Sequence, residues 1–250
     1  MKFDYLTNDT EKSLAPFFSP LMLSVSFNSI WILGLILLIF WPTKDLFTYF
    51  QGHKIPLNFL GVFVAALLIN SYLGLRCGRG EMFAKDYFSR LGYEGVITLE
   101  EEHNFFSYGL AAFILHSIFL LLIVLPLLIV SAAVSGISMS VFFKVLTVLF
   151  TASLLCRLFA FLMYLVFGKW SFLGYLLSRG FLIFFLFVTA VFASFINPVF
   201  LIYAFYQGQE LLPRSSINAY GYYMMIVTCV ILLLTLANQV MIRHNKAKRK

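Results

Sequence analysis

The stretch LAAFILHSIFLLLIVLPLLIVSAAVS, residues 110–135, decides the fold class of this chain. It contains no Asp, Glu, Lys or Arg. A helix needs about 20 mostly apolar residues to cross the hydrocarbon core of a bilayer, and this stretch is longer than that. We therefore expect a membrane-spanning helix here, with lipid as the solvent around it.

The composition of the whole chain supports the same conclusion. Of its 250 residues, 61% are apolar, 30 are Phe and only 12% are charged, whereas about 25% of the residues of a soluble domain are charged. A soluble core of this size could not hide so much apolar surface. The N-terminal segment carries Asp4, Asp9 and Glu11 before its first apolar run, which is not typical of a secretory signal. The sequence predicts an all-α integral membrane protein.

Six segments are predicted to span the membrane. They are residues 25–42, 57–75, 110–135, 141–167, 173–196 and 219–242. Between the fifth and the sixth lies a shorter apolar segment that opens with Asn197 and Pro198. We expect this segment to be half-inserted, because irregular backbone is tolerated at membrane depth where protein or water covers it.

Basic residues set the orientation of these spans. With the N-terminus in the cytoplasm, twelve Lys and Arg residues fall on inner segments and three on outer ones, which favours cytoplasmic termini and suits a bacterial inner membrane. The chain then divides into an amphipathic interfacial segment, residues 1–24, and a single six-helix transmembrane domain, residues 25–250. This domain has a cytoplasmic loop at 76–109 and a basic cytoplasmic tail at 243–250.

The predicted loop 76–109 mixes charged and large apolar residues. Three of the apolar ones share a helical spacing, so a short helix could rest one face on the membrane or on a partner. These three are Phe83, Tyr87 and Leu91. Glu100, Glu101 and Glu102 follow, directly before the third span. Two interpretations stand: with Thr98 they form a capping box favoured by the helix dipole, or they dock a basic cytoplasmic partner.

Several kinds of chemistry are missing from the sequence. All eleven acids lie outside the deep parts of the predicted spans, where ion-coupled transporters usually place a carboxylate. The only Gly-Lys pair, Gly168 and Lys169, lacks the earlier glycine of a phosphate-binding loop. The four His and three Cys residues have no metal-site spacing. We expect no catalytic residues, no cofactor, no metal and no nucleic-acid partner, and an energy source outside the chain.

Three cations lie within or near the predicted spans. Lys144 and Arg179 are close enough to the ends to reach headgroups. Arg157 lies too deep for its side chain to reach the headgroups, because the inner boundary of the span is some 15 Å away at the helical rise of 1.5 Å per residue. We expect Arg157 inside the bundle or in a wet cavity, where an anionic lipid or substrate headgroup is a plausible partner.

The order of these parts resembles the membrane subunit of ABC-2 type exporters, the permease class of ABC transporters. Similar local elements are Glu81 after the second span, Thr98 with Leu99, Pro126 midway in the third span, and Gly136 with Ile137 after it. The resemblance implies a coupling helix in the loop 76–109 that docks on a separate cytosolic ATPase subunit. It also implies a second permease, identical or related, and outward movement of an amphiphilic or lipid-linked substrate.

The resemblance also suggests roles for individual residues. The ATPase-docking surface would consist of Glu81, Phe83, Tyr87, Leu91, Thr98, Glu100, Glu101, Glu102 and Phe105. The substrate path would include Arg157 and Arg179. Two alternatives remain open: a non-transporting scaffold or assembly subunit, and a lipid-modifying enzyme with Arg157 and the half-inserted segment at its site.

Overall fold

The computed structural model describes residues 20–41, 57–75, 99–167, 171–207 and 219–247. Within these ranges the chain is almost entirely helical and contains no strand. The helices are α2 (Pro20–Ile39), α4 (Leu57–Leu75), α6 (Leu99–Val134), α7 (Met139–Phe167), α8 (Ser171–Phe192), α9 (Pro198–Gln207) and α10 (Ala219–Ala247).

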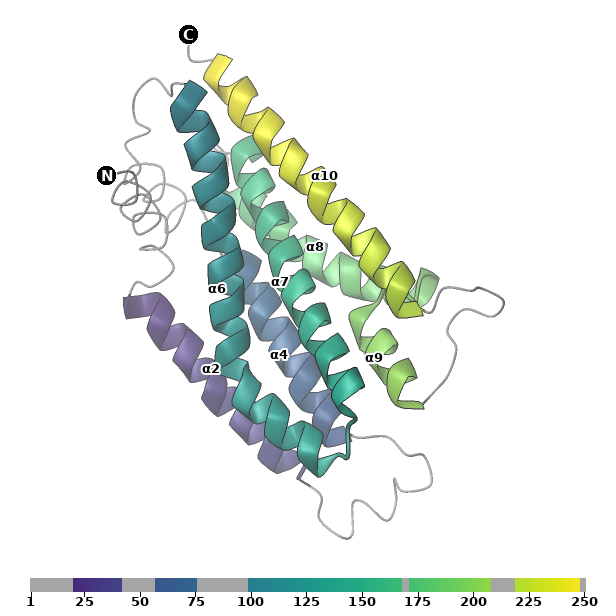
Figure 1. Cartoon of the computed structure of the whole chain (residues 1–250). Coiled ribbons are helices and arrows are strands. Elements are labelled where there is room, and N and C mark those ends of the chain that lie inside the picture. Colours follow the sequence, from purple (N-terminus) through teal and green to yellow (C-terminus); the bar gives the residue numbers. More distant parts are fainter. Residues whose placement is uncertain (1–19, 42–56, 76–98, 168–170, 208–218, 248–250) are drawn as a thin grey trace, which may run out of the picture.

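The helices alternate in direction between two ends of one bundle. In Figure 1, α4, α7 and α10 finish at the upper end, whereas α2 finishes and α6 turns into α7 at the lower end. Helix α7 lies at the centre, in contact with α4, α6, α8, α9 and α10, and α2 packs on α4 and α6. One apolar core cluster fills the lower half around Phe63 and Leu149, and a second fills the upper half around Phe113 and Phe161.

Four of the described helices are long and apolar enough to cross a membrane. Their apolar segments are Asn58–Leu75, Leu110–Val134, Met139–Phe167 and Ala219–His244. The first and fifth predicted spans correspond to α2, which has 20 residues, and α8, which has 22; their fully described apolar segments are Leu23–Ile39 and Leu176–Phe192. A multi-pass membrane protein is therefore supported, while the number six stays a prediction.

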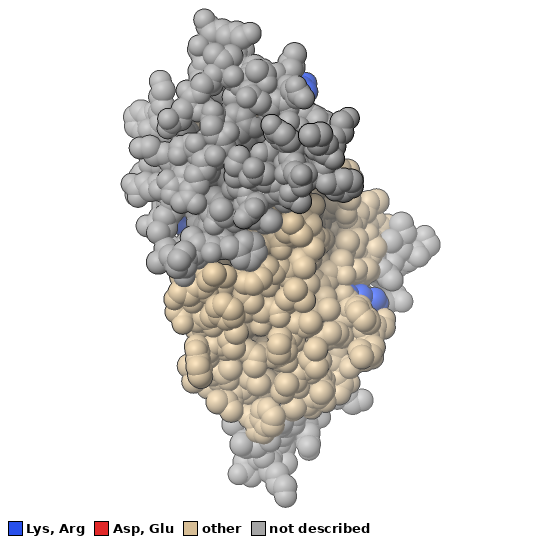
Figure 2. All heavy atoms as spheres, turned by 60° about the vertical axis from the view of Figure 1, so that its left-hand side comes forward, with Lys and Arg blue, Asp and Glu red and all other residues tan. Residues whose placement is uncertain are grey.

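The surface of these helices supports the membrane assignment. Large apolar side chains point outward, including Trp31, which is 75% exposed, and Phe192, which is 81% exposed. Figure 2 shows one face of the molecule on which the described residues form a broad surface almost free of charged atoms. Such a surface suits hydrocarbon, because a soluble monomer rarely exposes large continuous apolar patches.

Three predicted boundaries differ from the helices. Helix α2 begins at Pro20, and thus runs across the predicted boundary between the interfacial segment and the bundle. Residues 99–109, expected in the cytoplasmic loop, belong to α6, which is 36 residues long. The fifth predicted span, 173–196, is interrupted because α8 ends at Phe192. The rest of the predicted loop and most of the N-terminal segment lie outside the described residues.

Helix α6 ends in a Schellman motif, which explains the tight connection to α7. Gly136 has a positive φ of 64°, a backbone conformation that glycine adopts without steric cost. The amide of Gly136 donates to the carbonyl of Ala133, and that of Ile137 to the carbonyl of Ala132, as this motif requires. Earlier in α6, Pro126 removes one helical hydrogen bond, and Figure 1 shows the lower part of α6 bending.

The interruption between α8 and α9 depends on Asn197. Its side-chain oxygen accepts from the amides of Val199 at 2.9 Å and Phe200 at 3.3 Å, as an N-cap residue does. Pro198 follows at the first helical position, where its missing N–H costs nothing. The side-chain amide of Asn197 also donates to the carbonyl of Leu186 at 2.8 Å, which ties the start of α9 to α8. The 10 residues of α9 that the structure describes correspond to about 15 Å. A new helix thus begins after the fifth predicted span, while half-insertion of this segment stays a prediction.

Candidate functional site

A completely buried arginine marks the centre of the candidate site. Arg157, on α7, has no exposed surface, and its Nε donates to the hydroxyl of Ser117 on α6 at 3.0 Å. The helical segments that surround it, 57–75, 110–134 and 219–244, contain no Asp or Glu. The Ser117 hydroxyl thus gives the guanidinium one neutral hydrogen-bond partner, and Arg157 faces the interior of the bundle, as ionisable residues within membrane helices usually do.

Helix α4 makes room for the Arg157 side chain at Gly74. A Cβ atom at Gly74 would lie 3.0 Å from the carbonyl oxygen of Ser153, 3.3 Å from Cγ of Arg157 and 3.4 Å from Cβ of Cys156. Any larger residue would therefore push α4 away from α7. The absence of a side chain lets the two backbones approach closely, as small residues commonly do between membrane helices.

Further buried polar side chains lie in the same half of the bundle. Asn70 and Ser71 on α4, His116 on α6 and Asn238 on α10 all have less than 3% of their surface exposed. The amide of Asn238 donates to the carbonyl of Leu158 at 3.1 Å, which ties α10 to α7 one residue after the arginine. His116 stacks on Phe119, with ring centroids 6.1 Å apart. The upper half of the bundle thus contains a polar layer inside an otherwise apolar protein.

Arg179, the second arginine predicted in the substrate path, lies on the other side of the end of α4. Its Nη1 donates to the carbonyl of Leu75 at 3.5 Å and to the hydroxyl of Ser178 at 3.1 Å. Its guanidinium also lies 5.4 Å from the ring centre of Tyr72, within the range of a cation–π interaction. Arg157 and Arg179 therefore flank the last turn of α4 without being placed on the same face of it.

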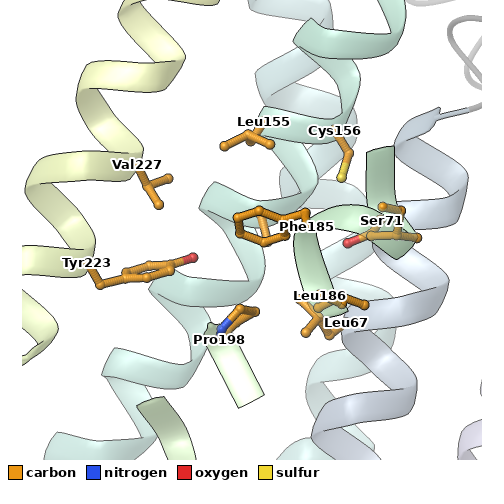
Figure 3. Close-up of a pocket in the computed structure, with 11 residues that line it drawn as sticks. Leu67, Ser71, Leu155, Cys156, Phe185, Leu186, Pro198, Tyr223 and Val227 are labelled. Atoms are coloured by element: carbon orange, nitrogen blue, oxygen red, sulfur yellow. The ribbon is translucent and has the colours of Figure 1, made fainter. Parts of the chain in front are cut away.

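A small pocket adjoins this polar layer. Helices α4, α7, α8 and α10 and the first residue of α9 line it (Figure 3). Its lining is apolar apart from Ser71, Cys156 and Tyr223. The hydroxyl of Tyr223 lies 3.3 Å from that of Thr151. One polar group of the lining thus has a partner on α7.

The predicted docking residues divide into two groups. Glu81, Phe83, Tyr87, Leu91 and Thr98 lie outside the described residues. Glu100, Glu101 and Glu102 fall in the first turn of α6, and Phe105 in its second, with only their backbone described. Acids in a first helical turn interact favourably with the helix dipole. This position fits the interpretation of the acids as a helix N-terminal cluster and leaves a docking role untested.

Some features of the site could not be found by sequence reasoning. Ser117, Gly74 and Asn238 carry no individual signal, and the pocket exists only because five helices meet. Among the described ranges, no three His, Cys, Asp or Glu side chains come close enough to hold a metal ion. No protein-family model, no curated protein and no solved structure matches the chain.

Proposed function

We propose that the chain is the membrane-spanning permease subunit of an ATP-driven exporter of the ABC-2 type. It would couple a separate cytosolic ATPase to outward movement of an amphiphilic or lipid-linked substrate. The observation that carries the proposal is the long helix α6. Its 36 residues correspond to about 54 Å, much more than the roughly 30 Å of a hydrocarbon core.

The surplus length of α6 lies at its acidic start. The apolar segment begins only at Leu110, so the first turn with Glu100, Glu101 and Glu102 projects beyond it at the upper end of the bundle. The basic end of α10, with exposed Arg243, lies at the same end. If this end is cytoplasmic, as the distribution of basic residues indicates, a rigid acidic helix end is available to a cytosolic partner. Opposite charges would steer that partner and fix its register.

The interior of the bundle supports a passive, driven subunit. Its described apolar helices contain no carboxylate that could carry a proton or a sodium ion. They do contain Arg157, and Arg179 precedes the pocket residue Leu182 by about one turn of α8. We infer that these two cations interact with the anionic part of the substrate. A second permease, identical or related, would complete the transporter.

Co-purification tests this proposal directly. The full chain, tagged and extracted from its own membrane in a mild detergent, should bring with it a protein that hydrolyses nucleotide. Changing Glu100, Glu101 and Glu102 together to Gln should reduce recovery of that protein, without loss of membrane insertion. The control changes Lys248, Arg249 and Lys250 to Gln, which alters the charge by the same amount with the opposite sign. Recovery of a partner without nucleotide hydrolysis would favour the scaffold alternative.

Orientation can be measured independently. A single Cys at position 101, in a chain whose own cysteines are replaced by Ser, should react with a membrane-impermeant maleimide only after the cells are opened. Reaction in intact cells would place the acidic helix end outside and remove the proposed docking role.

A further inference from the structure

One face of α2 turns away from the rest of the bundle and carries a polar side chain. Helix α2 lies at one side of the bundle (Figure 1), where it packs on α4 and α6. Its exposed side chains recur every three or four residues and thus form a stripe along the helix. This α2 stripe consists of Phe27, Asn28, Trp31, Ile32, Leu35 and Leu38. Asn28 is its only polar member, and no hydrogen bond within the described part of the chain involves its side-chain amide.

Asn28 lies at the depth of the apolar helices. The amide of Asn58, at the start of α4, donates to the carbonyl of Phe40 at 3.1 Å, which fixes the lower end of α2 beside that of α4. Asn28 precedes Phe40 by 12 residues, or about 18 Å of helix. The 18 residues of the apolar segment in α4 correspond to about 27 Å. Val25, further along α2, still packs on the upper core cluster. The Asn28 amide is therefore at bilayer depth, away from both ends of its neighbours.

An outward-facing amide at this depth needs a partner. Hydrocarbon offers no hydrogen bond, so an unpaired amide is costly there. Threonines of this protein form the bond within their own helix, as Thr147 and Thr235 do with the carbonyl one turn earlier. A buried asparagine binds another helix instead: Asn238 of α10 donates to the carbonyl of Leu158 in α7. Because Asn28 faces away from its own bundle, a helix of another chain can supply the corresponding bond.

The chemistry of the amide favours a second copy of this chain as that partner. A carboxamide has two N–H donors and an acceptor oxygen, so two asparagines can satisfy each other. Two copies inserted in the same orientation are related by a two-fold axis along the membrane normal, and the same surface of each copy forms the contact. This symmetry keeps each residue at the depth of its counterpart. The α2 stripe contains no charged residue that would be repelled by its own copy.

We propose that the α2 stripe is a contact between two copies of this chain, with the two Asn28 side chains hydrogen-bonded to each other. Trp31 and Leu35, one and two turns further along α2, pack around this pair. The contact itself does not depend on an exporter function. Only the identification of the second copy with the second permease rests on the proposed function.

Dimerisation of the purified full chain in vesicles tests the contact. Copies labelled with a donor or an acceptor fluorophore are reconstituted in phosphatidylcholine vesicles over a series of protein densities, and energy transfer gives the fraction of dimer. Asn28→Leu fills a similar volume without hydrogen bonds and should weaken the dimer about tenfold, as two interhelical hydrogen bonds allow. Asn28→Gln keeps the donors and the acceptor and should restore most of the dimer. Thr228→Leu removes a polar side chain from an exposed position of α10 and should change nothing.

Cysteine crosslinking locates the contact without changing Asn28. In a chain whose own cysteines are replaced by Ser, Leu35→Cys should form a disulfide-linked dimer under a mild copper–phenanthroline oxidation. The control is Leu233→Cys on α10, because Leu233 is also exposed and lies outside the α2 stripe. This variant should stay monomeric on a denaturing gel.

The outcomes are distinct. A chain that stays monomeric at every protein density would overturn the proposal, and so would a dimer that Asn28→Leu leaves unchanged. Crosslinking through Leu233→Cys rather than Leu35→Cys would place the contact elsewhere and remove the role of the α2 stripe. None of these results concerns the ATPase, since the vesicles contain no other protein. Conversely, failure to recover an ATPase would overturn the proposed function and leave a measured α2 contact intact.

Discussion

The two halves of the bundle use buried polar side chains differently. In the lower half, Asn58 and Asn197 bind backbone groups at helix ends, where carbonyls and amides lack helical partners. In the upper half, Arg157 lies in the middle of α7 and binds the side chain of Ser117. Ionisable residues of this kind inside a membrane bundle are candidates for function.

Replacing Arg157 should have the largest effect. Arg157→Ala leaves a void beside Gly74 and removes the partner of the Ser117 hydroxyl, and we expect a loss of about 3–5 kcal/mol in the free energy of unfolding. Unfolding in mixed detergent micelles measures it. A loss below about 1 kcal/mol would contradict this prediction, because it would mean that the surrounding helices close the void left by Arg157 at little cost.

Arg157→Met distinguishes structure from function at the same position. Methionine fills a similar volume without the charge, and such replacements of buried charges are often neutral or stabilising. We expect a folded protein whose complex with the proposed ATPase has lost its activity. Full activity of this variant would give Arg157 a structural role only, and the contrast between the two halves would disappear.

Asn58 should give the next largest effect, and a purely structural one. Its amide donates to the carbonyls of Leu37 at 3.0 Å and Phe40 at 3.1 Å, and its oxygen accepts from Ser131 at 2.6 Å. Asn58→Ala leaves these buried groups without their partner, and we expect a loss of about 3 kcal/mol. Ser131→Ala removes one of the three bonds and should cost less. The activity of the folded fraction in complex with the proposed ATPase should stay at the wild-type level in both variants. A specific loss of that activity would contradict a merely structural role.

Much of this arrangement could be predicted from the sequence. The second span was expected at 57–75, where α4 lies, because its apolar run is bounded by polar residues on both sides. The pair Asn197 and Pro198 correctly indicated an interruption, since an N-cap followed by proline starts a new helix. Arg157 was expected inside the bundle on depth alone, and its complete burial confirms that.

The remaining features depend on tertiary packing. The start of α6 at Leu99 agrees with the capping-box interpretation of Thr98. The third span itself was expected only from residue 110, because a polar stretch of good helix formers continues a helix without any change in hydrophobic pattern. The partners of Arg157 come from residues 40 or more positions away in the sequence, such as Ser117 and Gly74. The pocket requires residues of α4, α7, α8, α9 and α10 to meet, which no periodicity encodes.

Gly74 tests the upper half by a smaller change. Gly74→Ala places a Cβ atom 3.0 Å from the carbonyl oxygen of Ser153, and we expect it to cost about 2 kcal/mol, as overpacking does. Gly180→Ala is the matched control in α8, where nothing lies within 4 Å of the added carbon; it should stabilise the helix by about 0.8 kcal/mol. Equal behaviour of the two variants in a thermal unfolding measurement would disprove a close approach of α4 and α7.

The smallest effect is expected at Gly136, at the lower end. Its φ of 64° costs a residue with a Cβ atom about 1 kcal/mol, so Gly136→Ala should lower the free energy of unfolding by about that amount. Gly136→Asn should lower it by less, because asparagine tolerates this conformation.

Cys156 provides a local readout, since it is buried and its Cβ atom lies 3.4 Å from the carbon that Gly74→Ala adds. Reaction of Cys156 with a membrane-permeant maleimide should become faster in Gly74→Ala and stay slow in Gly136→Ala. If the change at the lower turn also exposed Cys156, the two halves would respond as one unit, and the polar layer around Arg157 could not be treated as a separate site.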